Sequence, residues 1–254
     1  MLIDTHAHLN FKDFKDDADE IIQRSLSGDV WIINVGSQYN TSERAVELAE
    51  KYLAGVYAAI GLHPIHAQDE FQYEKYKKLA LRSLGEGGKV VAIGEIGLDY
   101  KSEYVSSKEE QKEVLLKQLD LAKELNLPVI IHCRQAHADL IQALQQSNNL
   151  TIKGVIHCFT GTWQVAQKYL QLGFYLGFNG IIFKLDLDEV IKNAPLERIL
   201  VETDCPYLTP AQEEGRNEPL YVKYVAEKVA QLKNLTFENV AEATTQNAKN
   251  LFKI

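Results

Sequence analysis

Residues 111–132 read QKEVLLKQLDLAKELNLPVIIH, and this stretch decides the fold class. Its first part, Gln111 to Leu125, has the spacing of an amphipathic helix, with apolar residues at Val114, Leu115, Leu119, Ala122 and Leu125. Asn126 and Pro128 mark the end of that helix. The apolar run from Pro128 to His132 then has the length of a buried strand. A helix followed by a short strand that ends on a polar residue is the unit that we expect elsewhere in the chain.

The same alternation of short apolar runs and longer amphipathic segments continues from one end of the chain to the other. This pattern is typical of βα units around a parallel sheet. The eight predicted strands are Leu2 to His6, Val30 to Val35, Val56 to Gly61, Val90 to Glu95, Pro128 to His132, Gly154 to His157, Phe174 to Phe178 and Ile199 to Thr203. Two further helices, about Pro219 to Leu232 and Thr236 to Phe252, are expected to cover the last strand and one end of the barrel. The sequence therefore predicts an α/β fold, a single (β/α)8 TIM barrel domain spanning residues 1–254.

Composition narrows the class of protein. With 254 residues and 46% apolar residues, the chain has the size of one such barrel. Its net charge of −8 argues against a broad basic face for nucleic acid. We expect a cytoplasmic protein, because the apolar runs are too short to span a membrane and no leader pattern stands at the start. The three cysteines lack CxxC spacing and are an odd number, which indicates reduced, buried thiols.

Polar side chains of the kind that bind metals recur at one place in the pattern, at or just after the end of a strand. In a parallel barrel these strand ends meet on one rim, where barrel enzymes place their active sites. The residues concerned are His6, His8, His63, Glu95, Asp99, His132, Arg134, His157, Glu202 and Asp204. We therefore expect residues two hundred positions apart to be neighbours at the C-terminal rim.

The alternation of side chains along a strand refines this expectation. His6 and His8 face the barrel axis together, with Ala7 pointing away. The same parity places Arg134 on the side of His132 and Glu202 on the side of Asp204. Each of the three cysteines directly follows a proposed ligand and is expected to point outward, into the layer between strands and helices. These are Cys133, Cys158 and Cys205.

Four histidines, one glutamate and one aspartate are more donors than one tetrahedral ion uses. The set His6, His8, Glu95, His132, His157 and Asp204 favours two divalent cations bridged by a carboxylate, for which we choose Glu95. Nitrogen and carboxylate donors suit zinc and manganese and also admit magnesium. The residue types therefore predict a metal-dependent hydrolase.

Some of the polar residues have simpler interpretations. His66 and His137 lie in a loop or an early helical turn without a partner in register, so we expect them outside the site. His63 either contacts substrate or shapes its turn. Asp4 is expected to hold backbone amides near His6, and Glu202 either assists proton transfer or supports a neighbour by a hydrogen bond, the supporting role being favoured.

With these residues in place, the chain resembles the TatD family of metal-dependent deoxyribonucleases, and the similarity runs nearly from end to end. The motifs that carry it are Ile3–Leu9 (IDTHAHL), Gly61–Pro64 (GLHP), Gly94–Tyr100 (GEIGLDY), Pro128–His132 (PVIIH), His157–Gly161 (HCFTG), Val201–Leu208 (VETDCPYL), Arg216–Pro219 (RNEP) and Asn247–Phe252 (NAKNLF). HxH alone is a weak signal, whereas the set together is highly specific.

The resemblance implies that His6, His8, Glu95 and Asp204 hold one ion and that Glu95, His132 and His157 hold the other. It implies a DNA or nucleotide substrate, cleaved at phosphodiester bonds from a strand end by a water that two metal ions activate. Asp204 then accepts or relays the proton, with Glu95 and Glu202 as the other candidate catalytic carboxylates, and His63 and Arg134 orient the phosphate.

The chain departs from the family pattern in two places. Gln135 stands where the family usually has aspartate, and the loop Gln212–Gly215 (QEEG) is acidic where it is typically basic. These departures leave the metal site intact but weaken the case for strong DNA binding. A small-molecule amide, ester or lactone hydrolase using the same metals is therefore the alternative, and a non-enzymatic barrel protein is a third.

Overall fold

The helix and strand that decide the fold class form as expected, and their ends have clear local causes. The computed structural model describes residues 1–83, 88–101, 107–146 and 151–254. Helix α4 (Lys108–Leu125) begins three residues before the expected position, because Ser107 and Glu110 form a capping box at its start. It ends where Asn126 adopts a left-handed conformation, with φ 52°. Strand β5 (Val129–Arg134) follows directly.

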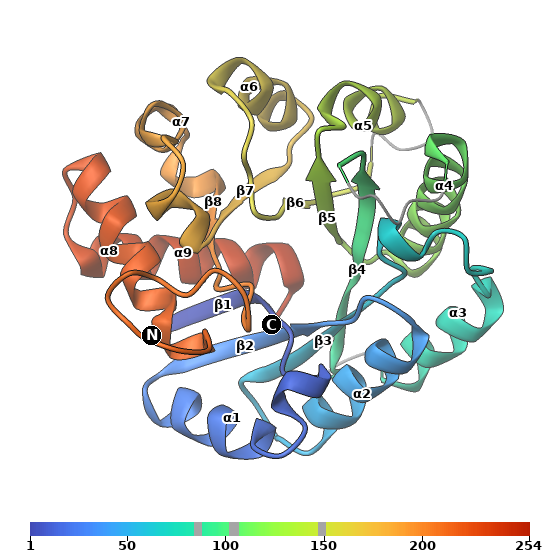
Figure 1. Cartoon of the computed structure of the whole chain (residues 1–254), viewed down its shortest axis with the longest axis horizontal. Helices are drawn as coiled ribbons and strands as arrows, with labels where there is room; N and C mark the ends of the chain where they lie inside the picture. Colours follow the sequence, from blue (N-terminus) through green and yellow to red (C-terminus); the bar gives the residue numbers. More distant parts are fainter. Residues whose placement is uncertain (84–87, 102–106, 147–150) are drawn as a thin grey trace.

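Eight parallel strands form one sheet in the order of the sequence, with the helices outside it (Figure 1). The strands are β1 (Leu2–Ala7), β2 (Val30–Val35), β3 (Val56–Ile60), β4 (Val90–Asp99), β5 (Val129–Arg134), β6 (Gly154–Ile156), β7 (Tyr175–Phe178) and β8 (Ile199–Val201). The sheet closes between β1 and the segment after β8, where Ala7 forms a parallel bridge with Cys205. Two backbone hydrogen bonds support this closure, from His8 N to Cys205 O at 2.9 Å and from Asp204 N to His6 O at 2.8 Å. The predicted (β/α)8 barrel is confirmed.

The helices follow the strands in alternation around the barrel (Figure 1). They are α1 (Ala18–Ser27), α2 (Tyr39–Glu50), α3 (Tyr73–Arg82), α4 (Lys108–Leu125), α5 (His137–Leu144), α6 (Trp163–Gln171), α7 (Asp188–Asn193), α8 (Val222–Lys233) and α9 (Phe237–Phe252). Short 3-10 turns stand at Lys12–Phe14, Pro64–His66, Gly180–Phe183, Leu196–Arg198 and Pro219–Tyr221. The last of these turns replaces the first turn of the helix expected from Pro219. No helix in the described part of the chain is long and apolar enough to cross a membrane.

The core has two layers, one inside the barrel and one between the strands and the helices. The inner layer is a cluster of small and branched side chains from seven strands: Ile3, Ile33, Val35, Ala59, Val91, Ala92, Ile130, Val155 and Leu200. Ala248, Leu251 and Phe252 of α9 belong to the same cluster. Helix α9 therefore closes the N-terminal end of the barrel and leaves the opposite rim for function.

Two strands carry an irregularity that changes which side chains face the axis. In β1, Asp4 pairs with Ile32 but Ala7 pairs with Asn34, so three residues of β1 span two residues of β2. Strand β4 shows the same three-for-two shift against β5 after Ile93. One extra residue reverses the alternation of side chains. The shift in β1 therefore turns His6 and His8 inward, and the shift in β4 does the same for Glu95.

Most strands end one or more residues away from the expected position, and three of these differences bear on the residues at the rim. Strand β4 runs on to Asp99, beyond the expected end at Glu95, because its pairing with β5 continues past the bulge. Strands β6 and β8 end before His157 and Glu202, which stand just beyond the sheet.

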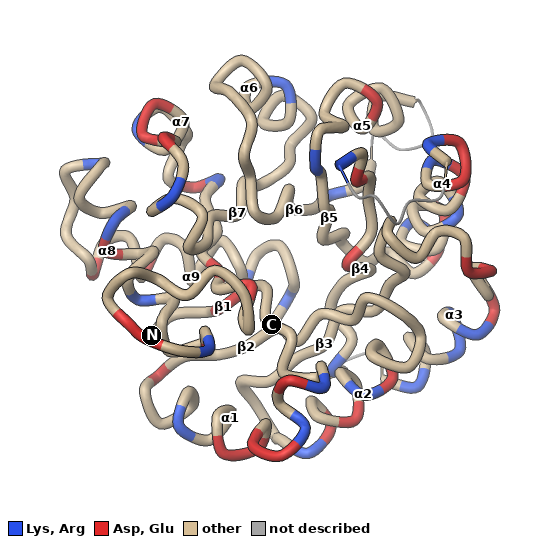
Figure 2. The backbone as a smooth tube through the Cα atoms, in the orientation of Figure 1, with Lys and Arg blue, Asp and Glu red and all other residues tan. Residues whose placement is uncertain are grey.

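Charges of both signs are interspersed along α1, α2 and α4 on the outside of the barrel (Figure 2).

Candidate metal centre

Five histidines and two carboxylates converge at the C-terminal ends of the strands. His6, His8, Glu95 and His157 are buried, whereas the ring of His132 and the carboxylate of Asp204 retain some exposure. His63, in the turn after β3, is the fifth histidine of the group. The structure thus brings together every residue that the sequence predicts as a metal ligand.

The carboxylate of Glu95 stands between two groups of histidines. Its Oε1 lies 3.0 Å from His132 Nδ1 and 3.0 Å from His157 Nε2. Its Oε2 lies 3.5 Å from His6 Nε2 and 3.8 Å from His8 Nε2. Because each oxygen faces a different group, one side chain is shared by both halves of the cluster.

The half formed by β1 and the end of β8 is completed by Asp204. Its Oδ1 lies 3.4 Å from His8 Nε2 and 3.9 Å from His6 Nε2, and the two imidazole nitrogens are 3.1 Å apart. Asp204 adopts a left-handed backbone conformation, with φ 59°. This turn of the chain directs its carboxylate toward the two histidines.

The sequence left two interpretations of His63 open, a contact to substrate or a residue that shapes its turn, and the structure shows the contact that shapes the turn. Its Nδ1 accepts the backbone N–H of Ile65 at 3.2 Å and so shapes the turn. Its Nε2 lies 3.4 Å from Glu95 Oε1, and its ring centroid is 4.5 Å from that of His132. His63 therefore lies against the β5–β6 half of the cluster. Its position would allow it to act as a further metal ligand.

The outward-facing nitrogens of three histidines are held by fixed partners. His8 Nδ1 lies 2.8 Å from the carbonyl of Val35, and His157 Nδ1 lies 3.2 Å from Glu202 Oε1. His132 Nε2 lies 3.0 Å from Asp99 Oδ2. Histidines that bind metals are commonly held from behind in this way by a carboxylate or a carbonyl.

Glu202 is fully buried, and it makes several contacts behind His157. Its Oε1 accepts the N–H of Cys158 at 2.7 Å and the amide of Asn179 at 3.1 Å. A Cβ at Gly177 would stand 2.6 Å from Glu202 Oε2, so glycine is what leaves room for this carboxylate. The geometry agrees with the supporting role that the sequence analysis favoured.

The surrounding histidines lower the pKa of both carboxylates. Burial alone would raise the pKa of Glu95, but His63, His157 and His6 together lower it well below its usual range. Burial would likewise raise the pKa of Asp204, but its hydrogen bond to His8 and the charges of His157, His6 and His8 together lower it. Burial lowers the pKa of His63 to about 4.

The arrangement fits divalent cations by its chemistry as well as by its geometry. Three groups of donor atoms lie within 4.8 Å of one another: His6, Glu95 and His157; His6, His8 and Asp204; and His63, Glu95 and His132. Imidazole nitrogens and carboxylate oxygens are the usual ligands of zinc and manganese. Among the described buried atoms, His6 Nδ1 has no hydrogen-bond partner, whereas Nε2 of the same ring faces Glu95 and Asp204.

The cysteines show where the parity argument holds and where it fails. Cys133 and Cys205 are buried in the layer between strands and helices, as expected. Cys158 is only half-buried, and its Sγ lies 3.5 Å from Asn179 Oδ1. The expected outward position of Cys158 is wrong, because β6 has already ended and Cys158 adopts a left-handed conformation, with φ 44°.

The remaining polar residues divide into those at the rim and those outside the cluster. Arg134 is exposed at the end of β5 and is not part of the donor groups. His66 lies in its 3-10 turn, and His137 Nδ1 lies 3.0 Å from the hydroxyl of Tyr169, both apart from the cluster. Asp4 accepts the N–H groups of His6 and Thr203, at 3.2 and 2.8 Å.

Sequence reasoning gave no role to two residues that support the site. Asp99 was noted among the strand-end residues, and its contact with His132 depends on the extension of β4 beyond the bulge. Asn179 follows β7, which carries no ligand, and an asparagine after a strand is too common to attract notice. Their roles appear only when the strands are assembled.

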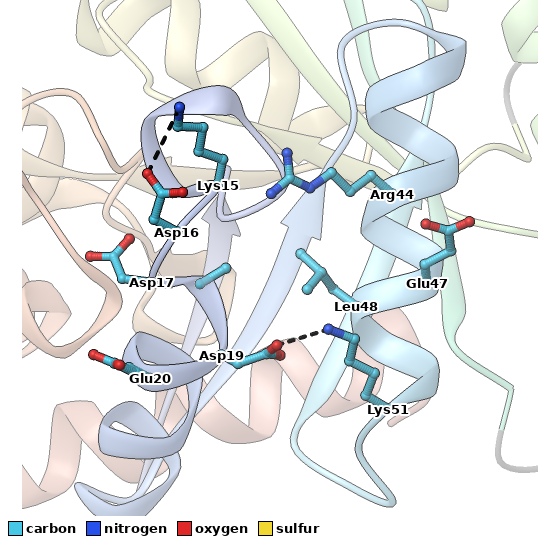
Figure 3. Close-up of a pocket in the computed structure, with 10 residues that line it drawn as sticks. Lys15, Asp16, Asp17, Asp19, Glu20, Arg44, Glu47, Leu48 and Lys51 are labelled. Atoms are coloured by element: carbon cyan, nitrogen blue, oxygen red, sulfur yellow. Dashed lines mark hydrogen bonds and ion pairs between the residues drawn. The ribbon is translucent and has the colours of Figure 1, made fainter.

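A separate cavity of about 320 Å³ lies between α2 and the segment that leads into α1 (Figure 3). Its lining is charged with both signs, and Lys51 pairs with Asp19 across it at 2.8 Å. None of its lining residues belongs to the histidine cluster. The cavity is therefore distinct from the histidine cluster.

Comparisons with known proteins agree with this geometry. The model of the family described as TatD related DNase matches residues 3–253. A metal-dependent hydrolase of Bacillus subtilis (strain 168) is 47% identical, and the match covers 100% of both chains. A deoxyribonuclease of Homo sapiens is 33% identical over 99% of this chain and 94% of its own length.

A 3'-5' ssDNA/RNA exonuclease of Escherichia fergusonii is 34% identical, over 100% of this chain and 99% of its own. Among solved structures, a TatD homologue from Escherichia coli K12 superimposes with a TM-score of 0.90 at 32% identity. That superposition covers 100% of this chain and 98% of the other. The similarity thus extends over the whole barrel, including every strand end that contributes to the cluster.

Proposed function

The chain belongs to the family of TatD-related DNases and is a metal-dependent hydrolase, and from this premise we propose that the histidine cluster is its active site and that it cleaves phosphodiester bonds in DNA. The observation that carries the proposal is the division of the cluster by Glu95, whose two oxygens face two different groups of histidines. Carboxylates placed in this way are typical of two-metal hydrolases. We treat residues 1–254 as one catalytic domain.

The residues of each half would hold one divalent cation. His6, His8 and Asp204 with Glu95 Oε2 form the first set, and His132 and His157 with Glu95 Oε1 form the second. We propose zinc or manganese at both positions, with magnesium as the third choice, because most of the donors are imidazole nitrogens. When bound, the two cations supply the positive charge that activates water and stabilises the transition state of phosphoester hydrolysis.

The side chains of the protein have separate tasks in this proposal. Asp204 accepts the proton of the attacking water, because its carboxylate is ionised and partly exposed at the mouth of the site. Glu95 shares its charge between both halves. Glu202 keeps His157 in one orientation and does not transfer a proton, since it is fully enclosed behind that ring.

Arg134 and His63 are the proposed contacts to the phosphate. Arg134 is exposed at the end of β5, two residues after His132, whose ring is hydrogen-bonded to Asp99. A guanidinium group there can pair with two phosphate oxygens at once. His63, neutral at pH 7 by its lowered pKa, stands next to the second metal position and can donate or accept one hydrogen bond.

The substrate proposal is a strand of DNA cut from its end. It is supported by two relatives that cover the whole chain, a deoxyribonuclease and a 3'-5' exonuclease of single-stranded DNA and RNA. We further propose that the protein acts in the cytoplasm, in keeping with three cysteines that are all free thiols.

The test combines metal analysis with DNA cleavage. Protein loaded with manganese or zinc should contain two ions per chain and release nucleotides from labelled DNA. His132→Ala should lower both the metal content and the rate, whereas His66→Ala, a histidine outside the cluster, should lower neither. Equal rates for the two variants would show that the cluster is not the active site. Turnover of amide, ester or lactone substrates without any DNA cleavage would favour the small-molecule alternative.

A further inference from the structure

One aromatic side chain is exposed on the rim beside the proposed active site. Of the aromatic residues in the described part of the chain, Tyr207 alone is exposed, with 53% of its surface accessible. It stands three residues after Asp204, in the loop between β8 and α8. A solvent-exposed aromatic ring next to the proposed active site can bind a ligand by stacking on it.

The exposure of Tyr207 is imposed by a fixed backbone. Its N–H donates to the carbonyl of Asp204 at 3.0 Å, and its carbonyl accepts the side-chain amide of Asn217 at 2.5 Å. Asn217 is buried, and the same amide donates to Thr203 O at 3.0 Å. The motif Arg216–Pro219, which the metal site leaves without a role, therefore anchors the loop that presents Tyr207.

The ring of Tyr207 stands against the first metal half. Its centroid is 6.4 Å from that of His8, with the planes inclined by 69°, while Phe11 stacks on His8 at 4.3 Å. Burial of part of the ring raises the pKa of Tyr207, and the carboxylates of Asp13, Asp204 and Glu95 raise it further. The uncharged face of a nucleobase can lie against this ring whether or not cations balance the charge of the nearby carboxylates.

We propose that Tyr207 is a stacking platform for the nucleobase beside the phosphate that is cleaved. The proposal rests on the proposed nuclease function and adds a contact that selects the substrate. A base that is paired within a duplex is stacked on its neighbours and is not free to lie on a side chain. Stacking on Tyr207 therefore favours strands whose terminal bases are unpaired, and it does so for every base, since each has a π-face.

The first experiment uses the unmodified chain with its metals and two single-stranded trinucleotides, one intact and one abasic at one end. Both ends are tested in turn. When the missing base is at the end that enters the site, the KM of the intact strand should be about tenfold lower than that of the abasic strand. This difference is the one expected for the loss of one base–aromatic stack. The value of kcat should change much less, because the platform does not touch the reacting atoms.

The second experiment exchanges the side chain. Tyr207→Ala should raise KM for the intact strand by about tenfold and leave KM for the abasic strand unchanged. Tyr207→Phe should retain the low KM, because it keeps the ring and loses only the hydroxyl. Leu81→Ala, another exposed apolar residue, is the matched control on α3.

The outcomes separate the two proposals. If the unmodified protein releases nucleotides and Tyr207→Ala has the same KM on both strands as the unmodified protein, the platform is contradicted and the nuclease function stands. A KM that rises equally for intact and abasic strands also contradicts it, since that result indicates a loop that has moved. If no DNA is cleaved at all, the nuclease function fails and the platform with it.

Discussion

The two halves of the proposed metal centre are held in place by different kinds of group. In the half at the barrel seam, His6, His8 and Asp204 are positioned by backbone: a bulge in β1, the closing hydrogen bonds and the carbonyl of Val35. In the other half, His132 lies within β5 and His157 directly follows the end of β6, and both are oriented by buried side chains. Side-chain supports can be removed one at a time, whereas backbone supports can be removed only by disturbing the barrel. The two halves should therefore respond differently to point mutation.

The largest effect on metal binding is expected where the halves meet. Glu95→Gln keeps the size of the side chain but removes the charge that both groups of histidines face. We expect both ions to bind more weakly and cleavage to fall by more than about a hundredfold, beyond what loss of a supporting residue causes. Metal analysis and DNA cleavage measure this, with Glu124→Gln on the surface of α4 as the control. Full retention of one tightly bound ion would show that Glu95 belongs to one half only.

A smaller effect, confined to one half, is expected from Glu202→Gln. This change weakens the support of His157 and leaves the backbone support of His8 untouched. The affinity for one of the two ions should fall by roughly 10- to 100-fold, as is usual for such supporting residues. Competition with a chelator resolves the two binding steps. Equal weakening of both steps would contradict the independence of the halves.

Asp99→Asn should weaken metal binding in the same half, but by less than Glu202→Gln. Asparagine can still accept a hydrogen bond from His132 Nε2, and Glu95 holds the other nitrogen of that ring at 3.0 Å. We expect one ion to bind about tenfold more weakly, at the low end of the range for supporting residues. The same chelator competition measures it. A loss as large as that in Glu202→Gln would mean that Asp99 has a direct part in the site.

The smallest effect on metal binding is expected from a side chain at the seam itself. Thr203→Val removes the hydroxyl that donates to Asp4 Oδ2 at 2.5 Å and leaves that buried oxygen without this partner. The free energy of unfolding should fall by about 1–3 kcal/mol, whereas the affinity for both ions stays the same. Urea unfolding and metal titration together test this, with Thr203→Ser as the variant that keeps the hydroxyl. Weaker metal binding in Thr203→Val alone would show that side chains also orient the seam half.

The relative direction of neighbouring side chains was predictable from the sequence, because alternation is a property of any extended strand. His6 and His8 share a face as expected, and so do His132 and Arg134, at positions where β5 keeps its register. Whether that shared face points to the axis was not predictable for β1 and β4. Counting from Ile3, which lies inside the barrel, places His6 outside unless one residue is added by the bulge.

The supports of the site were predictable only where they are made by recognisable side chains. Glu202 stands in a motif with Asp204, so a supporting role was apparent. The carbonyl of Val35 has no identity in the sequence, since every residue carries one. The prediction for Cys158 was wrong for a related reason. Side chains alternate only within a strand, and β6 ends one residue before His157 because of how it pairs with its neighbours.

The sequence by itself determined the barrel, the residues of the histidine and carboxylate cluster at its rim and the family, because apolar periodicity and motif spacing are local properties of the chain. Only the tertiary structure decided how Glu95 is shared, which nitrogens are held from behind and that Tyr207 stands exposed beside His8. Those features depend on where strands far apart in the sequence are paired and on where their pairing slips by one residue. Such a slip belongs to the pairing of two strands, which no single stretch of sequence contains.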